Sequence, residues 1–383
     1  MSIPKTTQAY RLKTFERSLD GLVLDQNVTL PDTSQLKPTE VLVEIRAVSL
    51  NARDYQIASG TYPAPTSPPV GLIPVSDGAG VVLGVGPNVT TVAIGNRVVT
   101  HLCADWVYGD IGNEMQKSAL GGGRDGILAK HVVLEQHNLL PIPEHMSFRE
   151  AASLPVAGLT AFHCLFGHQG KTLQPGQTVL VEGTGGVSIA ALQLALNSGA
   201  RPIVISSSDE KLELAQKLGV APTDCVNYNK DKIWFQTVKN LTPRGEGVDH
   251  TIEIAGGLTM TKAILTTKNY GCVWVVGYMD DYKPPSTQHQ SADQGLPDVA
   301  KAVLYTQAQV QGVVCGSYKL FQQYLSAHEI AEKKVQQNLA SSNLLKPLVI
   351  EEQVYNWQQA KQAFEAQASG KFVGKIIIDV ANN

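Results

Sequence analysis

The sequence lacks several features that would assign the protein to a specialised class. No uncharged apolar run is long enough to span a bilayer, and the polar N-terminus MSIPKTTQAYRLKTFERS is unlike a signal peptide. Cysteine is scarce, with five in 383 residues and no Cys-x-x-Cys pair, which argues against a structural zinc lobe. The net charge of only −3 comes from interspersed residues of both signs. These absences predict a cytoplasmic protein that binds neither nucleic acid nor membrane.

The part of the chain before residue 155 is typical of a β-rich domain. A chain of 383 residues, 43% of them hydrophobic, is long for a single core, so two domains are expected. Short strands joined by Gly, Pro and Asn turns are predicted over residues 40–155, as in EVLVEIRAVSL and DGAGVVLGVGPNVTTVAIGNRVV. We hypothesise that the glycine-rich segment SALGGGRDG, residues 118–126, is a mobile lid.

From about residue 150 the pattern changes to alternating apolar runs and helical segments. The runs are TVLVEG, PIVISSS, DCVNY, HTIEIAG, CVWVVG and VQGVVCG, and this alternation predicts an α/β fold with a doubly wound parallel sheet. A long amphipathic helix, YKLFQQYLSAHEIAEKKVQQNLA, and a strand-like tail ending in GKIIIDV follow. We therefore expect one domain from residues 1–155 and 320–383, and a second from residues 156–319.

A glycine-rich turn joins the first strand of the second domain to its first helix. In VLVEGTGGVSIAALQLA, Gly183, Gly185 and Gly186 follow a β-branched run and precede an apolar helical pattern. Glycine permits the tight turn and leaves room for a pyrophosphate to approach backbone N–H groups at a helix N-terminus. Ser188 stands where the dinucleotide fingerprint has its third glycine. The position of these glycines between a strand and a helix nevertheless predicts a dinucleotide site.

The end of the next strand, VISSSDEK, bears on the choice between NADP and NAD. An NAD site usually places a carboxylate here, whereas this sequence has three consecutive serines with Lys211 close behind. Hydroxyl groups and a cation suit a 2′-phosphate, so we favour NADP. NAD stays possible because Asp209 could bind its ribose. A structural alternative is a helix cap, with Ser207 and Glu210 forming a capping box.

These motifs together resemble the medium-chain dehydrogenase/reductase superfamily over nearly the whole chain. The segments that carry the resemblance are LIPVSDGAGVVLGVGPNVTTVAIGNRV, AASLPVAGLTAF, VLVEGTGGVSIAALQLAL and GKIII. The resemblance implies a GroES-like β-barrel domain and an inserted Rossmann domain, with the cofactor in the cleft between them. It also implies a homodimer joined edge to edge through the sheets of the nucleotide domains, for which VQGVVCG is a plausible edge.

The positions that hold catalytic zinc in alcohol dehydrogenases of this superfamily differ here. Asn51 lies near the place of a cysteine ligand, Val75-Ser76-Asp77 matches the segment that brings a histidine, and Val156 matches another cysteine. Asp77 alone cannot form a zinc site, so we expect no metal. The chain then looks like the zinc-independent quinone oxidoreductase branch, whose Asn-x-x-Asp signature corresponds to Asn51 and Asp54.

The same resemblance implies a set of cofactor-binding residues. In that branch, Asn51 and Thr160 would hydrogen-bond the nicotinamide and its ribose, and the glycine turn would hold the pyrophosphate. The remaining expected cofactor contacts are Gly183, Thr184, Gly185, Gly186, Val187, Ser206, Ser207, Ser208, Lys211, Tyr228, Gly277 and Lys375.

The expected reaction is hydride transfer from NADPH to a quinone or an α,β-unsaturated carbonyl compound. A conjugated acceptor spreads the arriving negative charge, so hydrogen-bond donors can stabilise it without a metal. Tyr62 is the first candidate donor and Tyr55 the second, while Asp54 is a candidate catalytic carboxylate for which a structural role beside Arg53 or a backbone N–H is favoured.

Two further residues and two other functions stay open. His101 and Trp106 are predicted to shape the substrate pocket, although a lone histidine is more often a packed residue than an acid. The alternative functions are a zinc-independent NAD(P)-dependent alcohol dehydrogenase or aldehyde reductase, and a zeta-crystallin-like protein that binds NADPH without turnover.

Overall fold

The chain folds into two compact units. The computed structural model describes residues 4–63, 68–113, 117–279 and 295–380. Unit 1 comprises Met1–Leu159 and Cys315–Asn383, and unit 2 comprises Thr160–Val314. The division lies near the expected 155 and 320 but returns to unit 1 earlier, because the Gly316 carbonyl contacts His101 and the Tyr318 N–H donates to the Trp106 carbonyl.

Unit 1 is built on β-strands from both ends of the chain. Its seven-stranded sheet has the order β14-β15-β3-β4-β5-β7, with β6 paired to β3, and β1 and β2 form a separate hairpin. The strands are β1 Thr6–Leu12, β2 Leu22–Thr29, β3 Glu40–Leu50, β4 Asp77–Val85, β5 Arg97–Thr100, β6 His131–Glu135, β7 Leu139–Pro141, β14 Val354–Asn356 and β15 Ile376–Asp379. The tail therefore contributes β15 beside β3, where the two strands run antiparallel.

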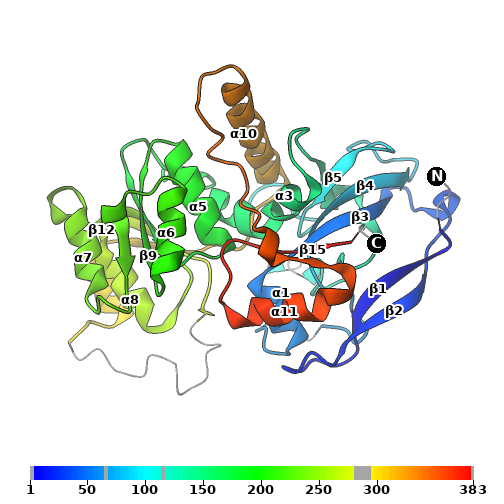
Figure 1. Ribbon diagram of the computed structural model, residues 1–383, viewed down its shortest axis with the longest axis horizontal. Coiled ribbons are helices and arrows are strands. Elements are labelled where there is room, and N and C mark those ends of the chain that lie inside the picture. The colour runs from blue at the N-terminus through cyan, green and yellow to red at the C-terminus, as the bar shows by residue number, and fades with distance from the viewer. Residues whose placement is uncertain (1–3, 64–67, 114–116, 280–294, 381–383) are drawn as a thin grey trace. The chain divides into compact units, whose positions relative to one another are not determined.

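Helices of unit 1 cover parts of this sheet and extend away from it. They are α1 Ala52–Ala58, α3 Phe148–Ala152, α10 Tyr318–Gln336 and α11 Ala360–Ser369, and a π-helical turn, Leu154–Gly158, follows α3. Figure 1 shows α10 standing away from the strands of unit 1. The helix ends at Gln336, four residues before the apolar pattern suggested, and buries mainly aromatic side chains of its first half.

The glycine-rich segment 118–126 packs closely against neighbouring backbone. The Gly126 N–H donates to the Ile73 carbonyl at 2.6 Å, and the Gly121 N–H donates to the Arg124 carbonyl at 2.9 Å. A Cβ added to Gly126 would lie 2.0 Å from the Val75 carbonyl oxygen. The glycines serve close backbone packing here, which accounts for their number without a lid, and the lid stays a prediction.

Unit 2 is a six-stranded parallel sheet. Its strand order is β10-β9-β8-β11-β12-β13, and every pairing is parallel. The strands are β8 Thr178–Glu182, β9 Arg201–Ser206, β10 Cys225–Asn227, β11 Val248–Glu253, β12 Thr267–Val275 and β13 Gln309–Gly312. Each corresponds to one of the six predicted apolar runs. Counted in chain order this is 3-2-1-4-5-6, the doubly wound Rossmann arrangement, which confirms the predicted fold class.

Helices connect the strands of unit 2. They are α4 Leu159–Phe166, which begins at the boundary, α5 Gly186–Asn197, α6 Asp209–Lys217, α7 Trp234–Leu241, α8 Gly257–Thr266 and α9 Val299–Thr306. No helix among the described residues is long and apolar enough to cross a membrane.

The predicted capping box at the start of α6 is wrong by one residue. Ser208, not Ser207, is the N-cap, and its side chain accepts the Lys211 N–H. The third helical position is therefore Lys211, which has no carboxylate to return a hydrogen bond to the cap. Ser207 remains outside the helix with an exposed side chain.

Candidate functional site

A buried polar cluster lies where β3 ends and α1 begins in unit 1. Asn51 is the N-cap of α1, and its backbone N–H donates to Oδ2 of Asp54 at 2.7 Å. Asp54 is fully buried, and this burial raises the pKa of its carboxyl group to about 6 although Arg53, at 3.8 Å, opposes the shift. These contacts give Asp54 the structural role that the sequence favoured over catalysis.

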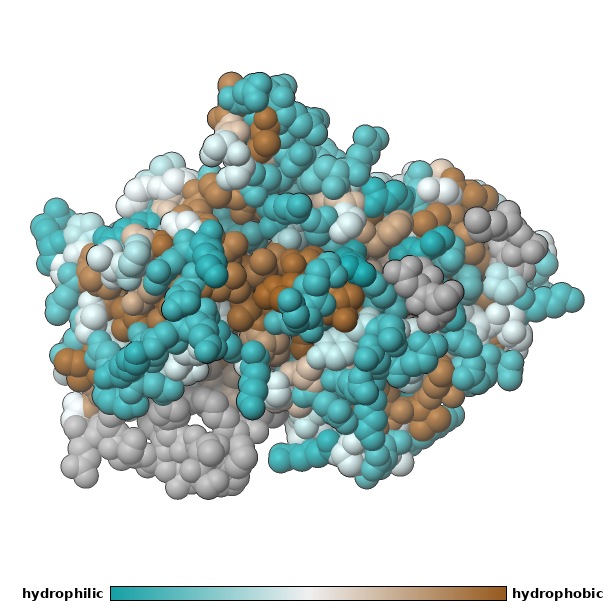
Figure 2. All heavy atoms as spheres, viewed as in Figure 1, coloured by the Kyte–Doolittle hydropathy of each residue, from teal (hydrophilic) through white to brown (hydrophobic). Residues whose placement is uncertain are grey.

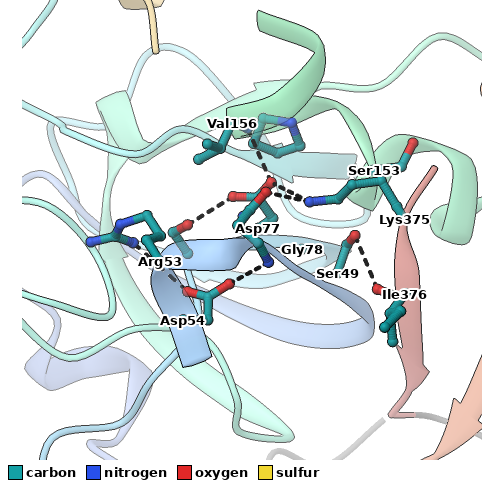
Figure 3. Close-up of polar contacts among 12 residues, drawn as sticks. Ser49, Arg53, Asp54, Asp77, Gly78, Ser153, Val156, Lys375 and Ile376 are labelled. Atoms are coloured by element: carbon teal, nitrogen blue, oxygen red, sulfur yellow. Dashed lines mark hydrogen bonds and ion pairs between the residues drawn. The ribbon is translucent and has the colours of Figure 1, made fainter. Parts of the chain in front are cut away.

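The C-terminal tail brings a lysine to this cluster. Ile376 of β15 is paired with Leu50 of β3, so Lys375 lies beside Asn51. Its ammonium group donates to Oδ1 of Asn51 and lies 3.6 Å from Oδ2 of Asp77. Burial lowers the pKa of Lys375, and the charge of Asp77 opposes this effect. Figure 3 shows Lys375 and Asp77 pointing toward one another.

One hydrogen-bond donor of the cluster has no acceptor among the described residues. Asn51 is 8% exposed, and its Nδ2 atom is buried with no hydrogen-bond partner among the residues that the structure describes. A buried donor left in this way costs about 1–3 kcal/mol. The amide is therefore suited to a ligand with a carbonyl oxygen, such as a carboxamide or a ketone.

The cluster does not fit a catalytic zinc ion. The carboxylate of Asp77 accepts the Ser76 hydroxyl at 2.8 Å and the Val156 N–H at 3.0 Å, and Lys375 lies against it. Zinc requires thiolate, imidazole or carboxylate ligands, and the nearby Asn51, Ser76 and Val156 side chains provide none. In the described part of the chain, no three His, Cys, Asp or Glu side chains come together as a metal site.

The two tyrosines proposed as donors differ in exposure. Tyr62 is 37% exposed, and the Arg53 guanidinium lies 5.7 Å from its ring centre. Tyr55 is partly buried and packs against the hydrophobic core of unit 1. The exposed Tyr62 is thus the better placed of the two to meet a ligand.

His101 and Trp106 lie inside unit 1. The His101 ring is fully buried, contacts the Gly316 carbonyl at 2.9 Å through Nε2 and packs edge-on against Tyr318. Burial lowers its pKa to about 4. Trp106 is also buried and donates its indole N–H to the Gly109 carbonyl. A packing role therefore describes both residues better than the expected role in a substrate pocket.

The glycine turn of unit 2 is a tight turn that leads directly into the N-terminus of α5. Gly183 has a φ of +71°, and its N–H donates to the Ile205 carbonyl, so a left-handed turn leads out of β8. Gly185 is the N-cap of α5, and a Cβ built there would meet nothing within 4 Å. This open space lies at a helix N-terminus, where backbone N–H groups bind anions.

Ser188, which replaces the third fingerprint glycine, has a structural role of its own. It is buried in the first turn of α5 and donates its hydroxyl to the Glu182 carbonyl at 2.7 Å. The departure from the third fingerprint glycine is therefore accommodated by a satisfied hydrogen bond. Thr184 is buried in the turn, while Gly186 and Val187 are partly exposed.

The three consecutive serines at the end of β9 have different roles. Ser206 is buried and Ser208 caps α6, so Ser207 alone has an exposed side chain. Lys211 is half-buried, and this burial lowers its pKa. Asp209 is already occupied, because it accepts from Asn227 at 2.7 Å and forms an ion pair with Lys230.

The remaining predicted cofactor residues have structural surroundings of their own. Tyr228 packs against the core cluster beside β9 and β10, and its N–H donates to the Ser206 carbonyl. Thr160 is buried near the start of α4. A Cβ at Gly277 would lie 2.7 Å from the Ile254 carbonyl oxygen, so close packing by itself requires glycine there.

Sequence reasoning missed the ion pair between Lys375 and Asp77. Lys375 was expected to reach the cofactor, and Asp77 was considered only as a weak metal ligand. The two residues are almost 300 positions apart in the chain, and they meet because β15 pairs with β3. The sequence alone does not reveal that pairing. A lysine directly before the apolar tail strand was the only available signal.

Comparisons with known proteins place the chain among oxidoreductases. Residues 37–144 match the description "Alcohol dehydrogenase GroES-like domain" and residues 186–329 match "Zinc-binding dehydrogenase". A zinc-type alcohol dehydrogenase-like protein of Schizosaccharomyces pombe is 36% identical over 346 residues, which is 90% of this chain and 92% of the relative. An NADPH-dependent alkenal/one oxidoreductase of Arabidopsis thaliana is 32% identical over 61% of this chain and 55% of its own length.

A solved structure matches the fold along its whole length. A putative alcohol dehydrogenase from Sinorhizobium meliloti has a TM-score of 0.82 and 27% identity, and the match covers 99% of this chain and 100% of that one. Together with the domain match over residues 37–144, this confirms the expected GroES-like first domain. The zinc in several of these descriptions contrasts with the residues around Asp77.

Proposed function

The chain belongs to the medium-chain dehydrogenase/reductase superfamily, and within it we propose a zinc-independent, NADPH-dependent reductase of quinones or α,β-unsaturated carbonyl compounds. The observation that carries the proposal is the amide donor of Asn51, which has no partner among the described residues and is held beside the Lys375–Asp77 ion pair. By the resemblance to zinc enzymes of the superfamily, Asn51 and Asp77 stand near positions that hold metal ligands there. Such a site offers hydrogen bonds but no Lewis acid, which suits conjugated acceptors.

Unit 2 supports the cofactor assignment. Its strand order reverses between β8 and β11, and doubly wound sheets bind ligands at the carboxyl ends of the strands at such a point. The N–H groups at the start of α5 would hold the pyrophosphate. For the 2′-phosphate, Ser207 offers an exposed hydroxyl and Lys211 a cation, whereas the carboxylate of Asp209 is engaged elsewhere. This arrangement favours NADP over NAD, and the Arabidopsis thaliana relative is likewise named for NADPH.

The chemistry requires one hydride and one proton for each acceptor reduced. The bound nicotinamide supplies the hydride. Asn51 would orient a carbonyl group through its Nδ2 atom. Tyr62 would donate a hydrogen bond to the oxygen that gains charge, and water or this tyrosine would supply the proton. The Arg53 guanidinium lies 5.7 Å from the centre of the Tyr62 ring and helps to hold that ring in place.

The proposal is tested by following NADPH oxidation with three acceptors. We expect turnover with 1,2-naphthoquinone or an aliphatic enone, little with a simple saturated aldehyde, and full activity after dialysis against a chelator. Calorimetry should show tighter binding of NADPH than of NADH.

Other outcomes select the alternatives. Preference for a saturated aldehyde, or for the corresponding alcohol with NADP⁺, would identify an alcohol dehydrogenase. Tight NADPH binding with no turnover of any acceptor would identify a binding protein. Activity lost with the chelator and restored by zinc would contradict the proposed mechanism.

A further inference from the structure

The buried ion pair of unit 1 contacts the proposed ligand-binding amide directly. We propose that Lys375, held by Asp77, is a positioning residue that fixes the orientation of the Asn51 amide and so presents its Nδ2 donors to the nicotinamide carboxamide or the substrate carbonyl. This inference rests on the proposed function, since it assigns a role within that site.

The argument begins with the two ends of an asparagine side chain. The amide has an oxygen that only accepts hydrogen bonds and a nitrogen that only donates them, and rotation by 180° exchanges their places. A protonated lysine has three donors and no acceptor. Beside the Lys375 ammonium, the Asn51 amide is therefore stable only with Oδ1 toward the lysine, and this is the orientation observed.

The lysine is itself held in place from the other side. Asp77 lies 3.6 Å from the ammonium group, and its own carboxylate is fixed by the Ser76 hydroxyl and the Val156 N–H. Side-chain exposure is 7% for Lys375 and 0% for Asp77, so water competes little for either charge. Figure 3 shows this arrangement, with Val156 and Lys375 both directed at the Asp77 carboxylate.

The consequence is a donor with a defined direction. With Oδ1 committed to the lysine, Nδ2 has no acceptor in the described structure and is available only to a ligand. Without the cation, the amide could rotate and present an oxygen, which would repel a ligand carbonyl. Loss of one such oriented hydrogen bond corresponds to about a tenfold effect.

The kinetic test is a double-mutant cycle on Lys375 and Asn51. Hydride transfer from NADPH to 1,2-naphthoquinone is measured by stopped flow for Lys375→Met, Asn51→Ala and the double variant. We expect Lys375→Met to lower the rate about tenfold, Lys375→Arg to restore most of it, and the double variant to be no slower than Asn51→Ala alone. Lys361→Met, which breaks an exposed ion pair with Asp20 in the same unit, is the matched control and should not change the rate.

The inference would be overturned if the rate losses of the two single variants multiplied in the double variant. A Lys375→Met rate equal to that of the wild type would overturn it as well. If Lys375→Met does not fold because Asp77 is left unpaired, Asp77→Asn/Lys375→Met removes both charges and takes its place.

A spectroscopic readout separates this inference from the proposed function. In protein with isotope-labelled asparagine, the Asn51 side-chain amide resonance is assigned by its absence in Asn51→Ala. We expect it to shift in Lys375→Met, to persist in Lys375→Arg, and to shift in the wild type when NADPH is added. An unchanged resonance in Lys375→Met refutes the positioning role, even in a protein that turns over quinones. A wild type without turnover refutes the function, whatever the resonance does.

Discussion

At the scale of single residues, the two glycines of the turn after β8 have different reasons to be glycine. Gly183 needs a positive φ, which any side chain would strain. Gly185 has an ordinary φ of −74° and open space where a Cβ would stand. The fold therefore requires glycine at 183 but not at 185, where the cofactor that we propose would lie close to the backbone.

This difference predicts the behaviour of Gly185→Ala. The variant should unfold close to the wild-type temperature, because the added methyl group meets no atom of the described residues. Its affinity for NADPH should fall by about tenfold or more, because the methyl group occupies the place of the pyrophosphate. Calorimetric titration with NADPH and a thermal melt measure the two effects.

Gly112→Ala is the matched control, since it adds a methyl group in equally open space on an exposed loop of unit 1. Unchanged NADPH binding by Gly185→Ala would place the cofactor elsewhere.

The sequence predicted the residue types of the site better than their contacts. It identified Asn51 and Lys375 separately, because each belongs to a recognisable motif. It could not reveal that the lysine binds the amide, since that contact depends on the pairing of β15 with β3. For His101 the sequence was misleading, because its position in the motif suggested a substrate pocket. In the structure its ring packs against Tyr318 and Phe321 of α10.

At the scale of secondary-structure elements, α10 is the part of unit 1 that buries a histidine on its packed face. It begins at a serine cap, Ser317, and exposes Ile330 while burying His328. Brown atoms among the teal ones at its upper end in Figure 2 show that apolar groups reach the surface there. The sequence predicted the helix from its period, and His328, four residues after Tyr324 and seven after Phe321, falls on the same buried face.

His328 should make the stability of the protein depend on pH. Its ring packs against Tyr324, neither ring nitrogen has a partner among the described residues, and burial lowers its pKa from 6.5 to about 3. Below pH 6.5 the unfolded chain binds a proton at this site that the folded protein does not. Stability should therefore fall as the pH drops from 6.5 toward 3, by up to about 1.4 kcal/mol per pH unit.

Urea unfolding of the wild type and His328→Leu between these pH values tests the prediction. The variant should lose this part of the slope and gain relative stability as the solution becomes more acidic. Parallel pH profiles for the two proteins would show that His328 does not stay neutral in the fold.

At the scale of the whole molecule, the sheet of unit 2 ends in a strand with an open side. β13 is the last strand in the sheet order, its residues are all exposed, and Val314 follows it at 52% exposure. The neighbouring helix α9 exposes Leu304 and Tyr305. Among the described residues no strand covers this edge. An open edge with apolar neighbours is suited to pairing with another chain, and we propose that a second copy pairs there.

The proposed homodimer predicts the effect of Val310→Lys. A charge in the middle of β13 should prevent edge pairing and yield a monomer in sedimentation experiments, whereas the wild type should sediment as a dimer. Val70→Lys adds the same charge at an exposed apolar position of unit 1 and should leave the dimer intact. A monomeric wild type, or a dimeric Val310→Lys variant, would contradict the proposal.

The sequence by itself determined the two-part organisation, the six parallel strands and the glycine turn, because strand period, turn residues and helix starts are local properties of the chain. Only the tertiary structure decided which polar groups meet. Asn51 caps α1, Asp77 begins β4 and Lys375 directly precedes β15. The contacts among these three side chains become informative only when folding brings them together and removes water from them.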